Sequence, residues 1–525
     1  MAGCAGGEKV QQGTIGYVEG FPGGVAADEP RAALIGRDIL TAGGTAADAA
    51  VAVYFALSVT MPSSASLGGG GVCLVRDDVG KTVRTLDFLA RAPEGTTAGA
   101  ERPSAIPGNP RGFYALYSRY GRMRWEQLLG PAENLARFGT PVSRAFAHDL
   151  AAAGDGLLSN PETARIFGAS GGSRVLREGE TLTQVELASV IGQLRRAGPG
   201  DFYAGGMTRR FVDAVRNVGG TLGVDDMRNY RPEWRDAIEV SVGNNTAHFT
   251  APPGAAGGVA AEMAAMLIRD ESAQDADEAQ RLHLLAETAM RAFADRGTWL
   301  RPDGGSSVAP GDLVSDARIG RLMTGYGAAR HTPARDLSPA PVERPENPAG
   351  TSFVVIDPYG AAVACSLTAN GLFGTGRLAT GTGVLLAARP GPAGHGPTSL
   401  GAMMVSNEFT NNLIFTATAS GGAAAPTAMA NVAARALLGG ETLDQAMRAK
   451  RVHHGGFPDI TFVESGMDAA LKQSLSSRGH TVSETAALGR VNAAFCSGGL
   501  PNDPKSCSIS ADIPPRGYGL ATSAD

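Results

Sequence analysis

The most informative stretch of the sequence is GTSFVVIDPYGAAVACSLTANGLFGTG, at residues 350–376. Thr351 stands at the head of an apolar run, a turn follows at Pro358 and Tyr359, and a second apolar run leads into a glycine-rich loop. Two apolar runs separated by turn residues predict a pair of β-strands. The stretch therefore presents one threonine at the end of a strand, where its hydroxyl can serve as a nucleophile.

A second glycine-rich stretch, PSSASLGGGG at residues 62–71, follows a helix that the small-residue run after Thr45 predicts. An earlier helix begins after Asp28, and residues 72–76 and 82–88 predict paired strands. The GGGG run lacks the Lys-Ser/Thr ending of a nucleotide-binding loop. Its glycines instead favour close packing of the backbone.

Residues 106–153 predict helices that break at Pro131 and Pro141. A further helix is expected from about Gly258 to Asp270. Residues 309–348 are rich in proline, alanine and arginine with little periodicity, which predicts an exposed connector.

Gly421 and Gly422 precede a predicted small-residue helix that runs to Leu437. Two glycines before a helix offer free backbone N–H groups to an oxyanion or a carboxylate. A tight strand-to-helix turn without a ligand is the alternative, because Gly-Gly turns are common. The residues alone leave both interpretations open.

The composition is that of a large globular protein, with 43% hydrophobic and 18% charged residues in a chain of 525. The formal net charge is −5, and no run of lysine and arginine marks a nucleic-acid or anionic-membrane surface. No window approaches 18 uninterrupted apolar residues, so no transmembrane span is expected. Neither nucleic acid nor a membrane-spanning helix enters the predicted function.

The five cysteines fall into two groups. Cys496 and Cys507 flank a loop rich in Gly, Pro and Asn, which predicts a disulfide that closes a hairpin and an oxidising compartment. Cys4, Cys73 and Cys365 stand alone in tail or strand-like contexts. The small residues around Cys4 are typical of the end of a lipoprotein signal, although no basic and apolar segment precedes them, and a chance cysteine in a tail is the alternative. We expect a periplasmic or secreted protein, lipid-anchored through Cys4 if that signal is real.

The chain resembles the γ-glutamyltransferases (γ-glutamyltranspeptidases), which belong to the N-terminal-nucleophile hydrolases. The matching segments, in order, are GGTAADAAVAVYFAL with PSSASLGGGG, LDF-x-x-x-AP, PPGAAGG, LAETAMRAFADR, the Thr351 hairpin, NGLFGTG, the Gly-Gly turn and RVHH. The resemblance implies an αββα four-layer sandwich and transfer of γ-glutamyl groups from small amides to water or an amine. It also implies self-cleavage into two subunits that stay together as a heterodimer, without a metal or organic cofactor.

The resemblance divides the chain into a flexible tail at 1–14, a large-subunit-like region at 15–350 and a small-subunit-like region at 351–525. It assigns several site residues one by one. Those expected to support the nucleophile, form the oxyanion site or bind substrate are Thr368, Asn370, Gly421, Gly422, Thr398 and Ser399. Only one serine remains of the family's substrate-binding serine pair.

The nucleophile itself allows two hypotheses. The family's Thr-Thr-His is here Gly350-Thr351-Ser352, and counting back from Asp357 without a gap puts Gly350 at the nucleophile position. In the first hypothesis Thr351 is the nucleophile after a slide by one residue, and the chain cuts itself between Gly350 and Thr351. A two-residue turn at Pro358 would favour it, pairing Thr351 with Ser366 and placing Thr368 on the same face. A bulged turn would reverse that inference.

In the second hypothesis the chain is never processed and serves as a non-catalytic binding or scaffold protein of the same fold. We favour the first, an acyltransferase or hydrolase with Thr351 as its nucleophile.

The residues that would bind the donor differ from the family pattern. Leu89 stands where the family has an arginine for the substrate α-carboxylate, and Arg91, two residues on, is the candidate replacement. The acidic residue that holds the α-amino group has no counterpart in residues 387–392. Glutathione is therefore not the expected donor.

His453 and His454 are adjacent in a chain with only eight histidines. Because no cysteine or carboxylate stands nearby at ligand spacing, we expect a structural role and no metal site.

Overall fold

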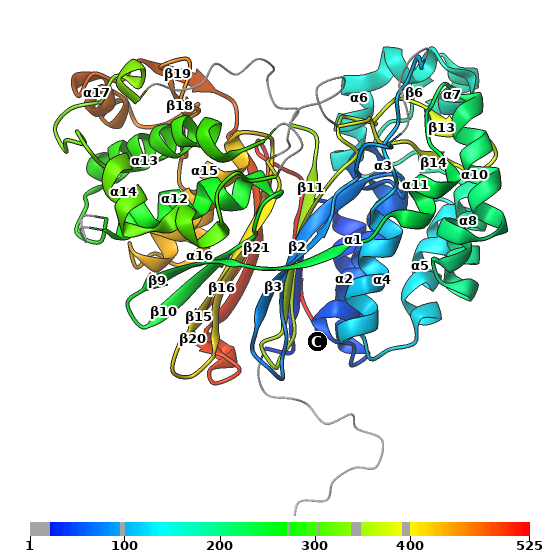
Figure 1. The fold of residues 1–525 in the computed structure, drawn as a ribbon, viewed down its shortest axis with the longest axis horizontal. Helices are drawn as coiled ribbons and strands as arrows, with labels where there is room; N and C mark the ends of the chain where they lie inside the picture. The colour runs from blue at the N-terminus through cyan, green and yellow to red at the C-terminus, as the bar shows by residue number, and fades with distance from the viewer. Residues whose placement is uncertain are drawn as a thin grey trace, which may run out of the picture.

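The structure is a computed structural model that describes residues 21–94, 100–269, 273–301, 305–337, 348–390 and 399–524. Two β-sheets lie face to face at its centre, and helices cover the outer side of each (Figure 1). The predicted αββα four-layer sandwich is confirmed. Within the described residues, no helix is both long and apolar enough to cross a bilayer.

The first sheet has seven strands, and all of its pairs are antiparallel. In spatial order they are β22 (Leu520–Ser523), β1 (Gly24–Ala27), β11 (Thr351–Ile356), β12 (Ala362–Thr368), β2 (Gly70–Arg76), β3 (Val83–Phe88) and β8 (Glu233–Asp236). The second sheet has six strands in the order β21 (Cys507–Ala511), β20 (Arg490–Leu500), β16 (Leu413–Ser420), β15 (Gly401–Asn407), β10 (Asn245–Phe249) and β9 (Ile238–Val242). Both segments singled out by their glycines lie at strands of these sheets.

The helices beside the first sheet come from the N-terminal part of the chain. They are α1 (Pro30–Thr41), α2 (Ala46–Thr60), α3 (Pro62–Ala65), α4 (Asn109–Tyr120), α5 (Trp125–Phe138), α6 (Arg144–Leu158), α7 (Pro161–Phe167), α8 (Val185–Ala197), α9 (Gly200–Ala204), α10 (Gly206–Asn217) and α11 (Val224–Asn229). As expected, α2 begins after Thr45, and it is buried along its whole length.

The predicted break at Pro131 is wrong, because α5 continues through this residue. A proline inside a helix removes one backbone hydrogen bond. Here the buried face of α5, which includes Leu128, Leu129, Ala132 and Ala136, holds the helix against its neighbours in spite of that loss.

The helices beside the second sheet are α12 (Ala255–Ile268), α13 (Glu278–Trp299), α14 (Asp316–Leu322), α15 (Ala424–Leu437), α16 (Leu443–Arg448) and α17 (Ala469–Ser477). A three-stranded sheet of β17 (Val452–His454), β18 (Thr461–Glu464) and β19 (Val482–Thr485) lies at the same side (Figure 1). Because α14 falls within residues 309–348, the prediction of an irregular connector is wrong for that part.

Three two-stranded sheets complete the described fold. They pair β4 (Thr140–Pro141) with β7 (Thr181–Leu182), β5 (Gly168–Ala169) with β6 (Arg174–Val175), and β13 (Leu378–Ala379) with β14 (Val384–Leu385).

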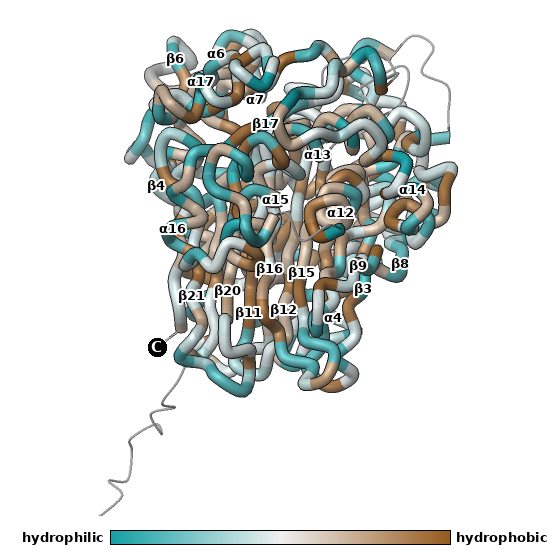
Figure 2. The backbone as a smooth tube through the Cα atoms, turned by 90° about the vertical axis from the view of Figure 1, so that its left-hand side faces the viewer, coloured by the Kyte–Doolittle hydropathy of each residue, from teal (hydrophilic) through white to brown (hydrophobic). Residues whose placement is uncertain are grey.

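The two faces of the first sheet bury different sets of side chains. Phe353 and Val355 of β11 pack into the core beside α1 and α2. Val354 and Ile356 pack into the core between the sheets, with Met404 of β15. Figure 2 shows the apolar residues concentrated along these central strands. The alternation fixes the direction of each residue at the head of β11.

Two disulfides join neighbouring strands. Cys496 and Cys507 are bonded between β20 and β21, as the sequence led us to expect. Cys73 and Cys365 are also bonded, between β2 and β12. The expectation that these two stand alone is wrong, because 292 residues separate them and only the strand order brings them opposite each other.

Candidate functional site

The hairpin of β11 and β12 has a different register from the one expected. Ser352 lies opposite Ser366, and Thr351 lies opposite Leu367. The turn spans residues 357–361 because the Asp357 carboxylate accepts the N–H groups of Tyr359 at 3.0 Å and Ala361 at 3.1 Å. The predicted two-residue turn and the Thr351–Ser366 pair are therefore wrong.

This register sends Gly350 and Thr351 in opposite directions. Thr351 follows the alternation of Phe353 and Val355, which face the helices beside the first sheet. Its side chain is completely buried, and Oγ1 donates a hydrogen bond to Oδ2 of Asp28 over 3.3 Å. The residue before it, Gly350, falls on the face directed at the second sheet.

Asp28 gathers the head of β11 and the second sheet around one buried carboxylate. It accepts bonds from the Ser352 N–H at 3.0 Å and the Ser420 hydroxyl at 3.0 Å. Nδ2 of Asn492 donates to Oδ1 of Asp28 over 2.8 Å. The partner of Thr351 is thus a shared structural acceptor as well as a potential base.

Gly350 lies beside Ser420, the residue that precedes the Gly-Gly turn. A Cβ atom added there would lie 3.2 Å from the Leu367 carbonyl oxygen and 3.8 Å from Cβ of Ser420. The Gly350 carbonyl accepts a hydrogen bond from Nη2 of Arg490 at 2.6 Å, and Nε of Arg490 donates to the Ser420 hydroxyl at 3.1 Å.

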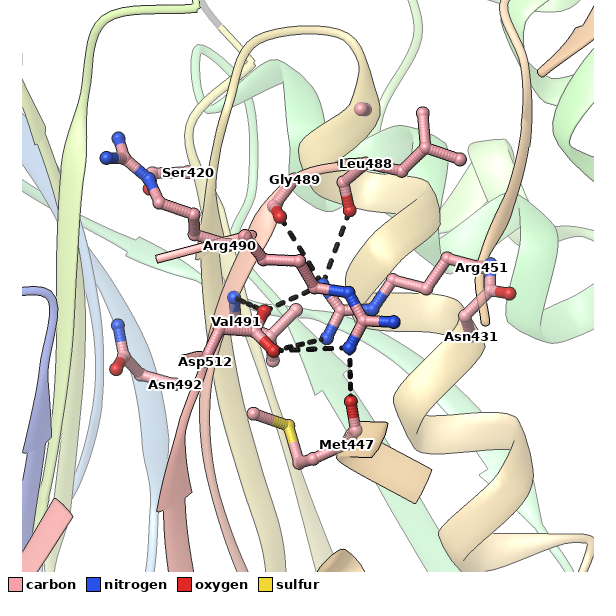
Figure 3. A network of polar contacts seen from close by, with 12 residues as sticks. Ser420, Asn431, Met447, Arg451, Leu488, Gly489, Arg490, Val491, Asn492 and Asp512 are labelled. Atoms are coloured by element: carbon pink, nitrogen blue, oxygen red, sulfur yellow. Dashed lines mark hydrogen bonds and ion pairs between the residues drawn. The ribbon is translucent and has the colours of Figure 1, made fainter. Parts of the chain in front are cut away.

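The backbone around Arg490 is held in place by ion pairs. Figure 3 shows that the Arg490 side chain points toward Ser420 and away from the ion pair formed by Arg451 and Asp512. Oδ2 of Asp512 also accepts the Val491 N–H at 2.7 Å. These contacts fix the start of β20, and with it the direction of Arg490.

Thr368 lies at the end of β12, beside the peptide bond that precedes Gly350. Its hydroxyl donates to the Ala349 carbonyl at 2.9 Å and accepts the Asn370 N–H at 3.0 Å. Nδ2 of Asn370 donates to the Ala388 carbonyl at 2.9 Å. Thr368 therefore meets the 349–350 peptide rather than Thr351.

Gly421 and Gly422 form the turn between β16 and α15, with φ of 118° and 65°. A Cβ atom at Gly421 would come within 2.9 Å of Cα of Gly489, and one at Gly422 within 3.1 Å of Cα of Pro348. No acceptor for either N–H group lies among the residues that the structure describes. The structure thus brings Gly350, Thr368 and the Gly-Gly turn together.

Of the residues predicted to bind the donor, Arg91 is already paired with protein carboxylates. Nη2 of Arg91 pairs with Asp87 at 3.1 Å and Glu233 at 2.9 Å. Burial opposes its charge, but these carboxylates, Asp87 foremost, raise the pKa of Arg91. A ligand carboxylate would have to displace them. Ser399 is buried, and Thr398 lies outside the described residues.

Three polar residues near the backbone of residues 349–351, which we call the junction, were missed from the sequence: Asp28, Arg490 and Asp149. Asp149 of α6 accepts the Ser63 hydroxyl at 2.6 Å. Burial raises the pKa of Asp149, and the charge of Arg490 opposes that shift. Ser63 belongs to the glycine-rich stretch already singled out, but Arg490 and Asp149 carry no local signal because they are distant in sequence.

His453 and His454 point to different neighbours. Nδ1 of His453 lies 2.9 Å from Oγ1 of Thr427, and burial lowers its pKa to about 3. Nε2 of His454 lies 3.2 Å from Oδ1 of Asp459. The expectation that no carboxylate stands near them at ligand spacing is wrong.

Comparison with known proteins identifies the family of the chain. A family model described as gamma-glutamyltranspeptidase matches residues 32–505. The glutathione hydrolase proenzyme of Escherichia coli K12 is 28% identical, covering 91% of this chain and 89% of its own length. The corresponding proenzyme of Pseudomonas aeruginosa is 32% identical, covering 71% and 69%.

Solved structures share the fold. A cephalosporin acylase from Bacillus halodurans superposes with a TM-score of 0.81 at 23% identity, covering 99% of both chains. The Helicobacter pylori gamma-glutamyltranspeptidase gives a TM-score of 0.55 at 25% identity over 62% of this chain and 95% of that one. By its sequence match over most of its length, this chain belongs to the γ-glutamyltranspeptidase family.

Proposed function

We propose that this chain is an uncut member of its family that binds a γ-glutamyl-like or related small amide without forming an acyl-enzyme. The observation that carries the proposal is the direction of Gly350. It faces the second sheet beside Ser420, the residue before the Gly-Gly turn, from the position where the gapless match puts the family nucleophile, and it has no hydroxyl. Without a nucleophile there, neither self-cleavage nor acyl transfer has a first step.

The surroundings of Gly350 support this assignment of the nucleophile position. In the family a threonine at the place of Thr368 supports the nucleophile, and the Thr368 hydroxyl here meets the peptide bond before Gly350. Thr351 lies on the other face of the strand, where it is completely buried and its hydroxyl is bound to Asp28.

A second candidate function is the self-cleaving hydrolase or acyltransferase that acts through Thr351. One observation favours it: the Thr351 hydroxyl has the Asp28 carboxylate as a potential base, and Arg490 polarises the Gly350 carbonyl. These are the groups that attack of Thr351 on the preceding carbonyl would need. Cleavage would release the Thr351 amine and leave a heterodimer that transfers γ-glutamyl-like groups to water or an amine.

The mass of the purified protein, measured after reduction and denaturation, decides between the two. The proposal expects one chain of 525 residues. Pieces of 350 and 175 residues would contradict it and establish Thr351 as the cleavage residue.

The variant Gly350→Thr tests the position of the missing nucleophile. We expect it to cut itself into 349 and 176 residues, because Thr368 already donates to the Ala349 carbonyl. The nearest atom to the new Cβ is 3.2 Å away, so a small local shift accommodates it. Gly350→Val is the matched control, since it has the same branching without the hydroxyl, and it should stay whole. A Gly350→Thr protein that folds and remains uncut would count against this position.

The bound amide is expected to lack a free α-carboxylate. Leu89 offers no charge to a carboxylate, and Arg91 already binds two protein carboxylates. Glutathione should therefore bind more weakly than its α-amide, as measured by calorimetry. The two disulfides support a periplasmic or otherwise oxidising location.

A further inference from the structure

A cluster of histidines and carboxylates lies beside the second sheet, at the corner formed by α13, β17, β18 and β19. Four of the eight histidines take part. The cluster consists of His283, Glu287, His331, His454, Asp459 and His480. No residue of the cluster is hydrogen-bonded to the junction at Gly350 among the described residues, so we consider the role of the cluster separately.

One half of the cluster is a directed chain of hydrogen bonds. Nε2 of His283 lies 3.0 Å from the Gly327 carbonyl, which can only accept, so this nitrogen carries a proton. Nδ1 of His283 then accepts from Nε2 of His480 at 2.8 Å, and Nδ1 of His480 accepts from the Thr461 hydroxyl at 2.8 Å. Burial lowers the pKa of both histidines, that of His480 to about 3, which keeps them neutral.

His454 is also fixed as a neutral ring. The Gly456 N–H donates to its Nδ1 at 3.1 Å, so the proton of the neutral ring is on Nε2, which donates to Asp459. Burial lowers the pKa of His454.

These proton positions disfavour a metal ion in either half of the cluster. A metal on Nε2 of His454 would need the lone pair that the N–H occupies, and the Gly456 N–H prevents the proton from moving to Nδ1. A metal on Nδ1 of His283 would compete with the His480 N–H. Every ring nitrogen of the four histidines already has a protein partner.

His331 differs from the other three because it lies between two carboxylates. Nδ1 is 2.6 Å from Oε1 of Glu287, and Nε2 is 2.8 Å from Oδ1 of Asp459. Ionised carboxylates only accept, so both ring nitrogens donate and the ring is an imidazolium. Burial opposes the charge, but the bonds to Glu287 and Asp459 outweigh it and raise the pKa of His331.

The same two carboxylates hold the backbone that follows His331. Glu287 accepts the Thr332 N–H at 3.1 Å, and Asp459 accepts the Ala334 N–H at 2.9 Å. Arg291 binds Glu287 and donates to the Thr332 hydroxyl at 2.7 Å. One imidazolium therefore organises two acceptors that fasten residues 331–334.

We propose that the His331 imidazolium is a pH-sensitive clasp that fastens residues 331–334 to α13 and to the turn between β17 and β18. When His331 is charged, it joins Glu287 to Asp459. When it loses its proton, one ring nitrogen becomes an acceptor facing a carboxylate oxygen, and the segment loosens.

The direction of the pH dependence follows from the raised pKa. The clasp is fully closed below the ordinary histidine value of about 6.5 and opens as the pH rises through the folded-state pKa. In that interval the opening equilibrium changes about tenfold per pH unit, because one proton is released. The charged and titratable groups around His331 on the surrounding elements include His283, Glu287, Arg291, His454, Asp459 and His480, together with Arg478, whose carbonyl accepts the His331 N–H at 2.6 Å.

None of the other groups is expected to titrate in the same interval. The three remaining histidines have lowered pKa values and stay neutral above pH 6.5. Glu287, with a pKa of about 2 due to its bonds with His331 and Arg291 against the effect of burial, stays ionised. Asp459 has a lowered pKa as well.

Hydrogen exchange of the full chain between pH 6 and 9 tests the clasp, with exchange rates of peptides from residues 325–337 divided by their intrinsic rates. In the wild type we expect opening to rise about tenfold per pH unit above 6.5 and then to level off. In His331→Gln the same peptides should open more at pH 6 and show no such rise. Asp459→Asn, at a half-exposed position, should reduce the rise if His331→Gln folds poorly.

His248→Gln is the matched control, because His248 is a buried histidine of β10 whose pKa is lowered to about 4 by burial. It should leave the pH dependence of residues 325–337 intact. Exchange of these peptides that does not depend on pH in the wild type would overturn the clasp. So would one equivalent of tightly held Zn²⁺ whose removal by a chelator exposes the segment.

Discussion

Asp28 joins the first sheet to the second through a single buried carboxylate. It stands at the end of β1 and receives hydrogen bonds from Thr351, Ser352, Ser420 and Asn492. A carboxylate with four donors is well satisfied, and its removal leaves those donors enclosed without a partner. We therefore expect Thr351 to contribute to the free energy of unfolding through its hydrogen bond to Asp28.

We expect Asp28→Ala to lower the free energy of unfolding by roughly 3 kcal/mol, because several buried donors lose their acceptor. Thr351→Val removes one donor and keeps the shape, so it should cost only about 1 kcal/mol. Urea unfolding measures both, and Thr522→Val in the outer strand β22 is a control that should change little. A larger loss for Thr351→Val than for Asp28→Ala would show that Thr351 has a role beyond this bond.

The helix α2 begins at the predicted place, and the structure shows a capping box there. The Thr45 hydroxyl accepts the Asp48 N–H at 3.1 Å, and the Asp48 carboxylate accepts the Thr45 N–H at 3.0 Å. Asp48 also accepts the N–H groups of Arg122 at 3.1 Å and Met123 at 3.2 Å, which tie α2 to the loop after α4. The cap is thus both local and tertiary.

We expect Thr45→Ala to cost about 1 kcal/mol of unfolding free energy, the usual loss for an N-cap. Asp48→Ala should cost roughly twice as much, since the loop N–H groups lose their acceptor too. Chemical unfolding followed by circular dichroism provides both values. Equal losses for the two variants would mean that the contacts to Arg122 and Met123 add nothing.

The elements were predictable where the signal is local, and their relative register was not. The start of α2, the β2–β3 pair and the hairpin around residue 357 follow from capping residues, apolar runs and turn residues. The length of the turn depends on the Asp357 side chain, which also accepts the Ala46 N–H of α2 at 3.2 Å. That contact joins residues 311 positions apart. A shift of the register by one residue reverses which side chains of β11 face the second sheet.

The candidate site was predictable to the same extent. Gly350, Thr368 and the Gly-Gly turn carry a sequence pattern, and the structure brings them together. Arg490 and Asp28 carry none, because each becomes significant only when β20 and β1 reach the head of β11. Arg91 had the right spacing, but it is paired with Glu233. This residue belongs to β8, which is distant in sequence and lies beside β3 in the sheet.

At the scale of the molecule, the two disulfides close loops of very different size. Cys73 and Cys365 are 292 residues apart in sequence, whereas Cys496 and Cys507 are 11 apart. In the chain-entropy model, a longer closed loop restricts the unfolded chain more. The long loop should therefore contribute more to stability.

We expect the double variant Cys73→Ala/Cys365→Ala to lose roughly 5 kcal/mol and Cys496→Ala/Cys507→Ala roughly 3 kcal/mol. Both double variants leave no free thiol from the removed pair, and guanidinium unfolding of each against the wild type supplies the values. If the short-loop variant proved the less stable, packing around β20 and β21 would outweigh the loop entropy.

The disulfide between β2 and β12 also encloses the junction. Cys73 precedes residue 350 and Cys365 follows it, so the backbone between them forms a covalent ring that contains the Gly350 peptide bonds. A cut at the junction would open this ring without releasing a fragment. The oxidised protein would then migrate as one species on a denaturing gel whether cut or whole, and its mass would differ only by one water. Any subunits made from this chain would be permanently tethered partners, unable to exchange with those of another molecule.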